Sequence, residues 1–304
     1  MLAEHRWGSK EEQVCPECGV MRRHYVIHTR RQWRCKDCKH TFSVTSRTSF
    51  NRRRISHKKL LSSLFLFVTS HKGKPALELK RILGGDYRTW FSLQHKIRDA
   101  FSRTVPIQKL GGVVEIDGGY FSGVIRNTRK KRCKKKPYHN RRATIVMREK
   151  NGRNKEGAGR TVAFICRSEN PSDIAALVKM WIEPGTTIRT DDHPAYRGIP
   201  PLLYKHEVVN HSIEYSSETG VNENQCESFF SRMRRAQKGI FHRITPHYMI
   251  DYANEIAWRE EVRRMDTATQ LQKLVSRVFN AGRSPDWSRY SHGNHRQVEP
   301  LFAA

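Results

Sequence analysis

The sequence lacks any apolar stretch close to the ~20 residues that a membrane span requires. Its longest apolar run, residues 60–68, is interrupted by Ser62 and Ser63. The first twelve residues, MLAEHRWGSKEE, also lack the apolar core of a secretory signal peptide. We therefore expect a cytoplasmic protein, in which thiols stay reduced and disulfide bonds are rare.

Acidic residues are scarce relative to basic ones. The 304-residue chain has 29 Asp and Glu against 57 Lys and Arg, a formal net charge of +28. Such an excess indicates a polyanionic partner, and nucleic acid fits better than a membrane. Residues 126–142 hold ten Lys or Arg in 17 positions, which predicts a solvated loop or hairpin against the phosphate backbone. The residues that we expect to bind DNA there are Arg129, Lys130, Lys131, Arg132, Lys134, Lys135 and Lys136.

Cysteine is also infrequent, but four of the seven cysteines form a C-x2-C-x16-C-x2-C pattern. Each C-x2-C pair is typical of a tight turn that presents two thiolates, and four thiolates complete a tetrahedral Zn²⁺ site. Trp33 and Phe42 flank the second pair, and residues 25–27 favour a β-ribbon. We predict one structural zinc ion, without which this small module does not fold. Its ligands are Cys15, Cys18, Cys35 and Cys38.

Residues 52–101 are predicted to be helical. A helix over 75–83, the turn Gly84-Gly85 and a helix over 87–101 have the outline of a helix-turn-helix motif. The alternative is a helical linker packed on the next domain. In the first interpretation, the side chains that face DNA are Arg88, Gln94, His95, Lys96 and Arg98.

Residues 111–123, GGVVEIDGGYFSG, predict a central strand of an α/β sheet with Asp117 at its end. Strands over 143–147 and 161–166 follow, then a helix that Asn170-Pro171 opens. A short strand over 186–190 ends at Asp191-Asp192, and Val208-Val209 mark another. This order, with acids at two strand ends, is typical of a ribonuclease-H-like domain.

Residues 221–239, VNENQCESFFSRMRRAQKG, are predicted to form a helix between a cap at Asn222 and a stop at Gly239. One face packs through Phe229, Phe230 and Met233. The opposite stripe is polar and consists of Asn224, Glu227, Ser231 and Arg234. Taken alone, Asn224-x-x-Glu227 is more consistent with a capping box, and Arg234 with a solvated side chain. Asp117, Asp191 and Glu227 together offer the oxygen ligands that hard divalent cations prefer.

The chain resembles a bacterial insertion-sequence transposase of the DDE class, in the ISXO-like group that carries an N-terminal zinc ribbon. The matching stretches occur in the family order and touch most of residues 15–258. They are CPECG…CKDCKHTFSVTSRTSF, VVEIDGGYFSG, TDDHPAY, VNHSIEY, NENQCESFFSRMRR and GIFHRI.

The resemblance implies that Asp117, Asp191 and Glu227 form a catalytic triad for two Mg²⁺ or Mn²⁺ ions. Arg234 stands where the family usually has Lys, and Arg235 beside it is a further expected DNA contact. Asn224 is a rival for the third position, because related members are described as using Asn there. We prefer Glu227 for its charge and for the 35 residues that separate it from Asp191.

Two further details of the triad remain open. Asp192 is an alternative to Asp191, although the pattern from Thr190-Asp191 to Tyr196 favours Asp191. Gly118 is a departure, since many relatives have an acid after the first Asp.

The implied activity is nicking at the ends of an insertion element, followed by joining of the 3′-hydroxyls to target DNA. The partners would be double-stranded DNA and further copies of the chain in a synaptic complex, associated with the bacterial nucleoid. The predicted domains are a zinc ribbon over 1–48, a helical DNA-binding segment over 49–105, a ribonuclease-H-like catalytic domain over 106–265 and a C-terminal helix and tail over 266–304. Alternatives are a non-catalytic zinc-ribbon DNA-binding protein and another ribonuclease-H-like nuclease, such as a junction resolvase.

Overall fold

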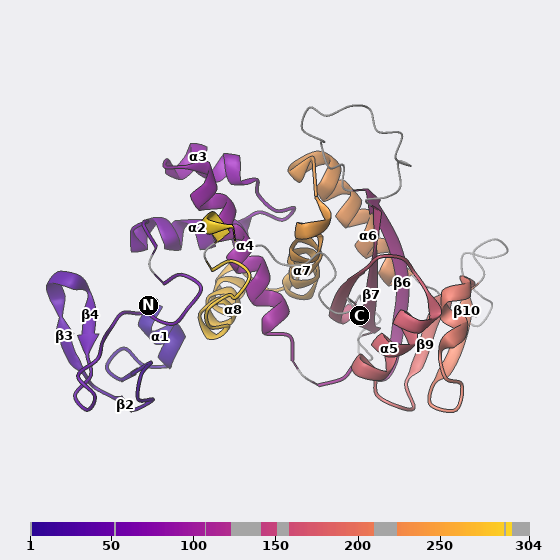
Figure 1. The fold of residues 1–304 in the computed structure, drawn as a ribbon, viewed down its shortest axis with the longest axis horizontal. Helices are drawn as coiled ribbons and strands as arrows, with labels where there is room; N and C mark the ends of the chain where they lie inside the picture. Colours follow the sequence, from indigo (N-terminus) through magenta and orange to yellow (C-terminus); the bar gives the residue numbers. More distant parts are fainter. Residues whose placement is uncertain are drawn as a thin grey trace. The chain divides into compact units, whose positions relative to one another are not determined.

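The computed structural model divides into two compact units, each described here by itself (Figure 1). Unit 1 joins Met1–Thr104 to Arg264–His295, and unit 2 contains Val105–Arg263 and Arg296–Ala304. The four-domain division stays a prediction. The residues that the structure describes are 2–51, 53–106, 108–122, 141–150, 158–209, 224–288 and 290–293.

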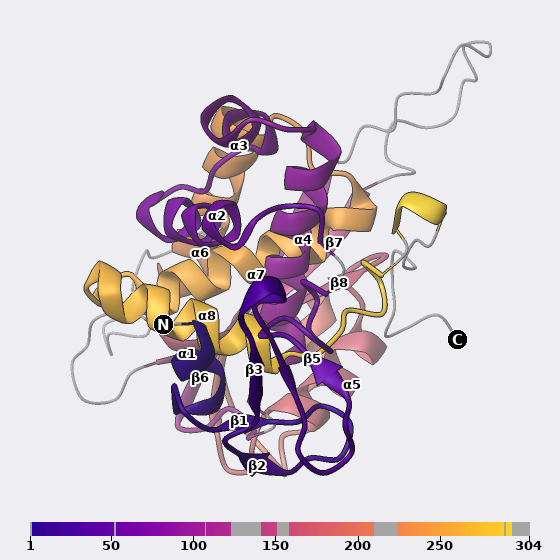
Figure 2. The same ribbon diagram turned by 90° about the vertical axis from the view of Figure 1, so that its left-hand side faces the viewer.

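A ribbon of short strands follows the first helix of unit 1, and Figure 2 shows it facing the viewer. Cys15, Cys35 and Phe42 are buried together, and Trp7 and Trp33 pack against them. The rings of Trp33 and Phe42, which flank the second cysteine pair, stack at 6.1 Å. The predicted β-ribbon is therefore confirmed. Its elements are α1 Leu2–Trp7, β1 Gln13–Val14, β2 Met21–Arg22, β3 Tyr25–Ile27, η1 His28–Arg30, β4 Gln32–Arg34 and β5 Thr41–Phe42.

Four longer helices complete unit 1, and three of them begin at a capping side chain. Ser56, Asp86 and Asp266 each accept a hydrogen bond from a backbone N–H of the first turn, which satisfies a donor that the helix leaves free. Gly84 and Gly85, with φ of 68° and 89°, make the turn between two of the helices, as the sequence predicted. The helices are α2 His57–Thr69, α3 Ala76–Leu83, α4 Tyr87–Arg103 and α8 Thr267–Asn280.

The predicted DNA-facing side of α4 is wrong for three of its five residues. Gln94, His95 and Arg98 are at most 2% exposed, so they lie in the interior of unit 1 rather than at a surface for DNA. The ring of His95 stacks on Trp287 at 4.4 Å. Arg88 is exposed and Lys96 is half-buried, so these two positions alone remain accessible among the five.

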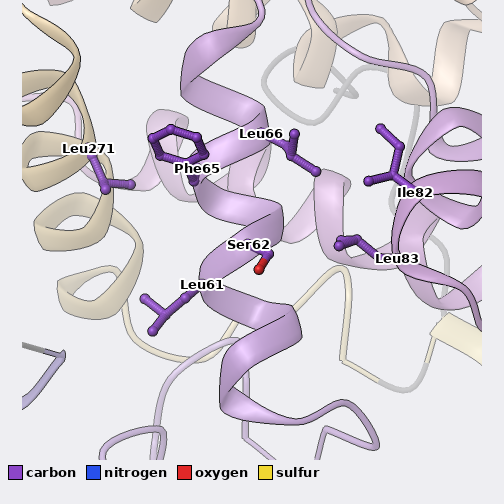
Figure 3. Close-up of a pocket in the computed structure, with 7 residues that line it drawn as sticks. All are labelled: Leu61, Ser62, Phe65, Leu66, Ile82, Leu83 and Leu271. Carbon is purple, nitrogen blue, oxygen red and sulfur yellow. The ribbon is translucent and has the colours of Figure 1, made fainter.

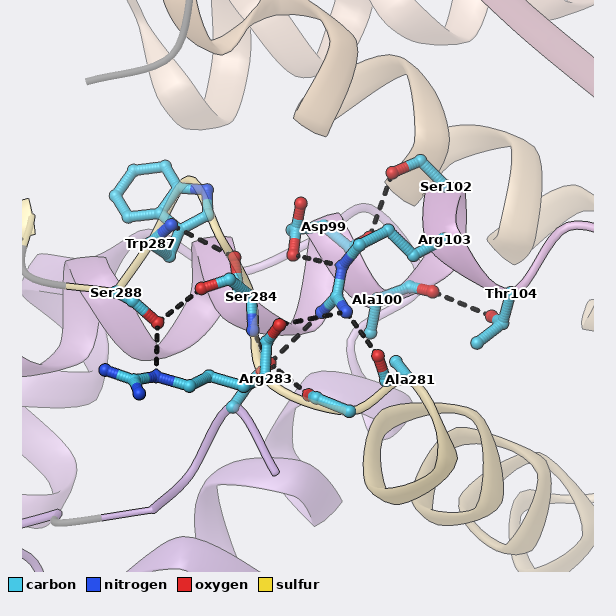
Figure 4. Close-up of polar contacts among 12 residues, drawn as sticks. Asp99, Ala100, Ser102, Arg103, Thr104, Ala281, Arg283, Ser284, Trp287 and Ser288 are labelled. Carbon is cyan, nitrogen blue, oxygen red and sulfur yellow. Dashed lines mark hydrogen bonds and ion pairs between the residues drawn. The ribbon is translucent and has the colours of Figure 1, made fainter. Parts of the chain in front are cut away.

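Residues 282–288 and 290–293 belong to unit 1, in the part of the chain where the sequence predicted a tail after the C-terminal helix. Figure 4 shows Arg103, at the end of α4, reaching the backbone carbonyl of Ala281, and its Nε also donates to Asp99 at 2.8 Å. Ser49 donates to the carbonyl of Gly282 at 2.9 Å. Trp287 is 3% exposed. The segment ends in a 3-10 turn, η4 Tyr290–His292.

An apolar pocket of about 480 Å³ lies on the helices of unit 1 (Figure 3). Phe65 and Ile82 are about half exposed beside it. A phosphate backbone requires cationic and hydrogen-bonding groups, so this surface does not suit DNA. The residues that line it are Leu61, Ser62, Phe65, Leu66, Ile82, Leu83 and Leu271.

Unit 2 is built on one mixed five-stranded sheet in the order β10-β9-β6-β7-β8. The strands β10, β9 and β6 are parallel, and β6, β7 and β8 are antiparallel. The predicted central strand therefore lies at the centre, and the predicted α/β class and element order are confirmed. The strands are β6 Val113–Ser122, β7 Arg141–Lys150, β8 Ala158–Cys166, β9 Thr187–Asp191 and β10 Lys205–Val209.

Helices cover both faces of this sheet, each over its own apolar core (Figure 1). On one face, Ile174, Leu177 and Val178 of α5 pack against Val114 and Ile116 of β6. The other face carries α6 and α7. The elements that cover the faces are α5 Pro171–Trp181, η2 Pro194–Gly198, α6 Asn224–Ala236 and α7 Pro246–Val262.

Within the described residues, no helix combines the length and the apolar composition that crossing a membrane requires.

The helix α6 is shorter than predicted at its C-terminal end. A π-helical turn, η3 Gln237–Phe241, follows Ala236, so Gly239 lies inside a turn and does not end the helix. The predicted cap Asn222 lies outside the described residues. Phe229, Phe230 and Met233 are buried, which confirms the predicted packing face.

Candidate functional site

The four cysteines of the ribbon form a cluster that suits a metal ion. Their sulfur atoms all lie within 4.8 Å of one another. The Sγ atoms of Cys15 and Cys38 are 3.6 Å apart, as are those of Cys18 and Cys35. Tetrahedral zinc with Zn–S bonds of ~2.3 Å places its sulfurs about 3.8 Å apart. The thiols therefore match the predicted four-cysteine site.

Asp117 lies in the middle of β6, whereas the sequence predicted it at the end of the strand. The strand continues to Ser122 because β7 pairs with it along that whole length. The pairing of β6 with the parallel strand β9, in contrast, ends at Glu115 opposite Arg189. Asp117 thus lies just beyond the end of the pairing between β6 and β9. Gly118 donates its backbone N–H to the Asp117 carboxylate at 2.7 Å.

The acids singled out from the sequence act on one another electrostatically. Burial, and then the negative charge of Asp191, raise the pKa of the Asp117 carboxyl from 3.8 to about 7. The charges of Glu169 and Glu227 contribute in the same direction, and the Gly118 N–H opposes them. Asp191 occupies the last position of β9. The fold therefore brings the charges of Asp191 and Glu227 to Asp117 from a strand end and a helix.

Close packing between α6 and β6 sets the position of Glu227. A Cβ on Gly119 would lie 2.6 Å from the ring of Phe230, so the absence of a side chain at Gly119 lets the helix lie directly on the strand. Glu227 itself is exposed and belongs to the first turn of α6. Asn224, its rival, begins the helix. The choice between them stays a prediction.

Arg234 lies two turns after Glu227 on the same helix. Its guanidinium carbon is 5.9 Å from the ring centre of Phe121 and 5.8 Å from that of Phe230. Such stacking restrains an otherwise exposed cation. Arg235 is exposed and donates to the Ser231 hydroxyl at 2.7 Å. The remaining predicted DNA contacts, residues 129–136, lie outside the described residues.

A buried ionic network fastens the first turn of α6 to the sheet. The Gln225 N–H donates to the Glu115 carboxylate at 2.9 Å, and Arg148 donates to the Gln225 carbonyl. Glu115 is fully buried and forms an ion pair with Lys150 at 3.0 Å. Both backbone polar groups of Gln225 are thus held, the N–H from β6 and the carbonyl from β7. We call this network the α6 anchor, and define it as Glu115, Arg148 and the backbone of Gln225.

Glu169 is a carboxylate near these acids that the sequence did not indicate. Its Oε1 accepts a hydrogen bond from the Tyr196 hydroxyl at 2.5 Å, and its backbone N–H donates to the Tyr120 hydroxyl at 3.1 Å. Glu169 directly precedes Asn170, the cap of α5. A residue directly before a helix cap is typically part of a solvated loop, so the sequence offered no reason to single out Glu169. Its contacts with Tyr196 and Tyr120 became visible only in the structure.

About half of the chain, residues 109–261, matches the family model described as the ISXO2-like transposase domain. The chain belongs to this family of DDE transposases. Residues 1–41 match the transposase zinc-ribbon domain, which covers the four-cysteine cluster. No curated protein matches the sequence.

Family membership confirms the resemblance to DDE transposases with a zinc ribbon and the ribonuclease-H-like class of unit 2. It implies DNA binding and transposition. The matched range contains β6, β9 and α6, and therefore all of the acids described above. In the ISXO2-like transposase the carboxylate oxygens of Asp117, Asp191 and Glu227 are of the donor type that Mg²⁺ and Mn²⁺ prefer.

Proposed function

We propose that this protein nicks DNA at the ends of an insertion element and joins the resulting 3′-hydroxyls to target DNA. The observation that supports this most strongly is the electrostatic coupling of Asp117 to Asp191 and Glu227 within the transposase domain. Like charges held together without a bound cation are unfavourable. Two divalent cations fit this arrangement because they would offset the repulsion.

Asp117, Asp191 and Glu227 hold the divalent cations in this proposal. When bound, the two cations activate the attacking oxygen and stabilise the leaving oxygen of an in-line displacement. Asp117 on the central strand is the residue on which both other acids act, so it would hold the cations together with Asp191 and Glu227. Arg234, restrained by Phe121 and Phe230, contacts a DNA phosphate beside the cleaved bond.

Two displacements at phosphorus make up the reaction. In the first, a water oxygen bonds to the phosphorus at the element end and the P–O3′ bond breaks. The water loses a proton, and the leaving oxygen gains one to become a 3′-hydroxyl. In the second, this 3′-hydroxyl attacks a target phosphodiester, and a target 3′-hydroxyl leaves in its place. Neither step needs an oxidant, a reductant or a covalent bond to the protein.

The zinc ribbon holds one structural Zn²⁺ through Cys15, Cys18, Cys35 and Cys38. The matching Sγ separations support this assignment. The ribbon, the basic segment of residues 126–142 and Arg235 bind double-stranded DNA, and the net charge of +28 favours that partner. Because two element ends are processed together, we expect at least a dimer in the complex with DNA.

The test uses DNA that carries the repeats flanking the gene, with Mg²⁺ or Mn²⁺, and a denaturing gel to resolve the products. Wild type is expected to give nicks at the repeat ends and joined products. Asp117→Asn, Asp191→Asn and Glu227→Gln are each expected to lose both, by at least about 1000-fold, while DNA affinity survives, because each variant removes a charged ligand and leaves the basic surface intact. Asp192→Asn is the matched control and should remain active.

Each other result has a definite meaning. Full activity in one acid variant removes that residue from the site, and loss of activity in an Asn224 variant with an active Glu227→Gln would make Asn224 the third ligand. DNA binding without scission under either metal would favour the non-catalytic DNA-binding protein. Cleavage of branched DNA without joined products would favour a junction-resolving nuclease.

A further inference from the structure

The carboxylate of Glu169 occupies the place where a side chain on Gly118 would begin. A Cβ built on Gly118 would lie 2.2 Å from one Glu169 oxygen and 2.5 Å from the other. Atoms other than hydrogen cannot approach so closely without bonding. Glycine directly after Asp117 therefore allows a carboxylate from the α5 side of the sheet to lie against the backbone of β6.

Two tyrosines hold Glu169 in this position. Tyr196, which is 1% exposed and belongs to the core under α5, donates its hydroxyl proton to Oε1 at 2.5 Å. Tyr120 of β6 accepts from the Glu169 backbone N–H at 3.1 Å. Tyr196 thus fixes the side chain of Glu169, and Tyr120 fixes its backbone.

Glu169 is electrostatically linked to the acidic group. Burial raises the pKa of its carboxyl, the Tyr196 hydrogen bond and the charge of His193 oppose that rise, and the negative charge of Asp191 adds to it. Glu169 in turn raises the pKa of Asp117. A neutral side chain of the same shape would accept the Tyr196 hydrogen bond equally well and would avoid this repulsion. A carboxylate in this position is favourable where a cation lies between it and the two aspartates.

We propose that Glu169 is a fourth carboxylate of the divalent-cation site and that Tyr196 is the positioning residue that fixes it against Gly118, the residue after Asp117. This inference rests on the proposed function, because it assigns a further oxygen ligand to the same cations. Gly118 is part of the same arrangement, because its missing side chain leaves the space that the Glu169 carboxylate fills.

The test measures Mn²⁺ affinity of the full-length, zinc-loaded protein without DNA, by electron paramagnetic resonance of the free ion. Glu169→Gln is expected to weaken Mn²⁺ binding about 10-fold or more and to leave the melting temperature without Mn²⁺ unchanged or higher. The amide oxygen still accepts from Tyr196, so a merely structural role predicts no change in affinity. Tyr196→Phe should weaken Mn²⁺ binding in the same direction but less.

Glu183 provides a matched control elsewhere in the unit. Its carboxylate also lies close to a glycine, 3.0 Å from a Cβ built on Gly111, but outside the acidic group. Glu183→Gln is expected to keep wild-type Mn²⁺ affinity. Gly118→Ala should mimic Glu169→Gln, and adding it to Glu169→Gln should weaken binding little further, because both act on one carboxylate.

Asp117→Asn separates failure of this inference from failure of the proposed function. If Asp117→Asn weakens Mn²⁺ binding and abolishes cleavage while Glu169→Gln does neither, Glu169 is not a ligand and the proposed function stands. If neither variant alters Mn²⁺ binding or cleavage, the proposed cation site itself is wrong.

Discussion

Asp117 is surrounded by groups that disfavour its negative charge. Burial and three neighbouring carboxylates raise its pKa to about 7, whereas an aspartate in an unfolded chain titrates near 3.8. One pKa unit corresponds to ~1.4 kcal/mol, so the ionised residue costs the metal-free protein on the order of a few kcal/mol. The same arrangement that favours a divalent cation thus reduces stability in its absence.

Asp117→Asn should therefore stabilise the protein at high pH. The folded wild type holds the Asp117 proton more tightly than the unfolded chain, so its free energy of unfolding falls as pH rises from about 4 to about 7. Asparagine removes that decline. In thermal unfolding without added Mg²⁺ or Mn²⁺, the advantage of the variant should be larger at pH 8 than at pH 5. An equal difference at both pH values would contradict the raised pKa.

Single residues also mark the limit of prediction from the sequence. Asp117, Asp191 and Glu227 were predicted from local patterns, namely the apolar runs that precede the two aspartates and a polar stripe on a helix. Glu169 was not singled out, because its contacts with Gly118 and Tyr196 join segments that are distant in sequence. His95 on α4 was wrongly predicted to face DNA, because its burial also depends on a residue that is distant in sequence. Its partner Trp287 follows almost two hundred residues later, in a segment with no apolar periodicity.

At the scale of elements, α6 depends on an anchor that is polar rather than apolar. Arg148 is 2% exposed and reaches both the Gln225 carbonyl and Glu260, which belongs to α7. Glu115 accepts from the N–H of the same Gln225. The anchor thus fixes the first turn of the helix two residues before Glu227.

Arg148→Met should destabilise unit 2 by about 2–3 kcal/mol, because it leaves the buried Gln225 carbonyl without its donor. Glu260 loses one of its basic partners but keeps Arg232 and Arg263. Hydrogen exchange of the β6 and β7 amides would measure the loss. The matched control is Arg189→Met, which breaks the more accessible pair with Glu207 at 2.9 Å and should cost about 1 kcal/mol. Equal losses of stability in the two variants would mean that the α6 anchor contributes no more than an accessible ion pair.

The zinc ribbon is an element that depends on its ion. Its strands have two or three residues each, and its buried cluster contains Cys15, Cys35 and Phe42. Chelation of zinc, or Cys35→Ser, should therefore unfold residues 13–42 and leave unit 2 intact. Limited proteolysis followed by mass spectrometry would locate the new cleavage sites. Unchanged protection of this segment after chelation would argue against a zinc site.

For the whole molecule, the net charge of +28 should dominate the affinity for DNA. Replacing the seven named Lys and Arg of residues 129–136 by Ser should reduce the slope of log K against log salt by up to about 6, since each phosphate contact contributes ~0.9. Fluorescence anisotropy at several salt concentrations measures the slope. An unchanged slope would exclude this segment as a phosphate contact.

The α/β class and the order of strands and helices in unit 2 followed from local apolar patterns and caps, such as Asn170 before α5. The extent of β6 did not, because Gly118 and Gly119 indicate a turn when read in isolation. Their pairing with Ile145 and Thr144 of β7 keeps them in the strand. Long-range pairing of this kind has no local signature in a sequence.

The return of α8 to unit 1 has a consequence for synthesis on the ribosome. Unit 1 joins Met1–Thr104 to Arg264–His295, so it lacks one helix until α8 has been synthesised. Unit 2 is contained almost entirely between those two parts and can fold earlier. At ~5–20 residues per second, translation of that last part takes roughly two to six seconds. The nascent protein can therefore bring Asp117, Asp191 and Glu227 together in unit 2 before its N-terminal helices have their final partner.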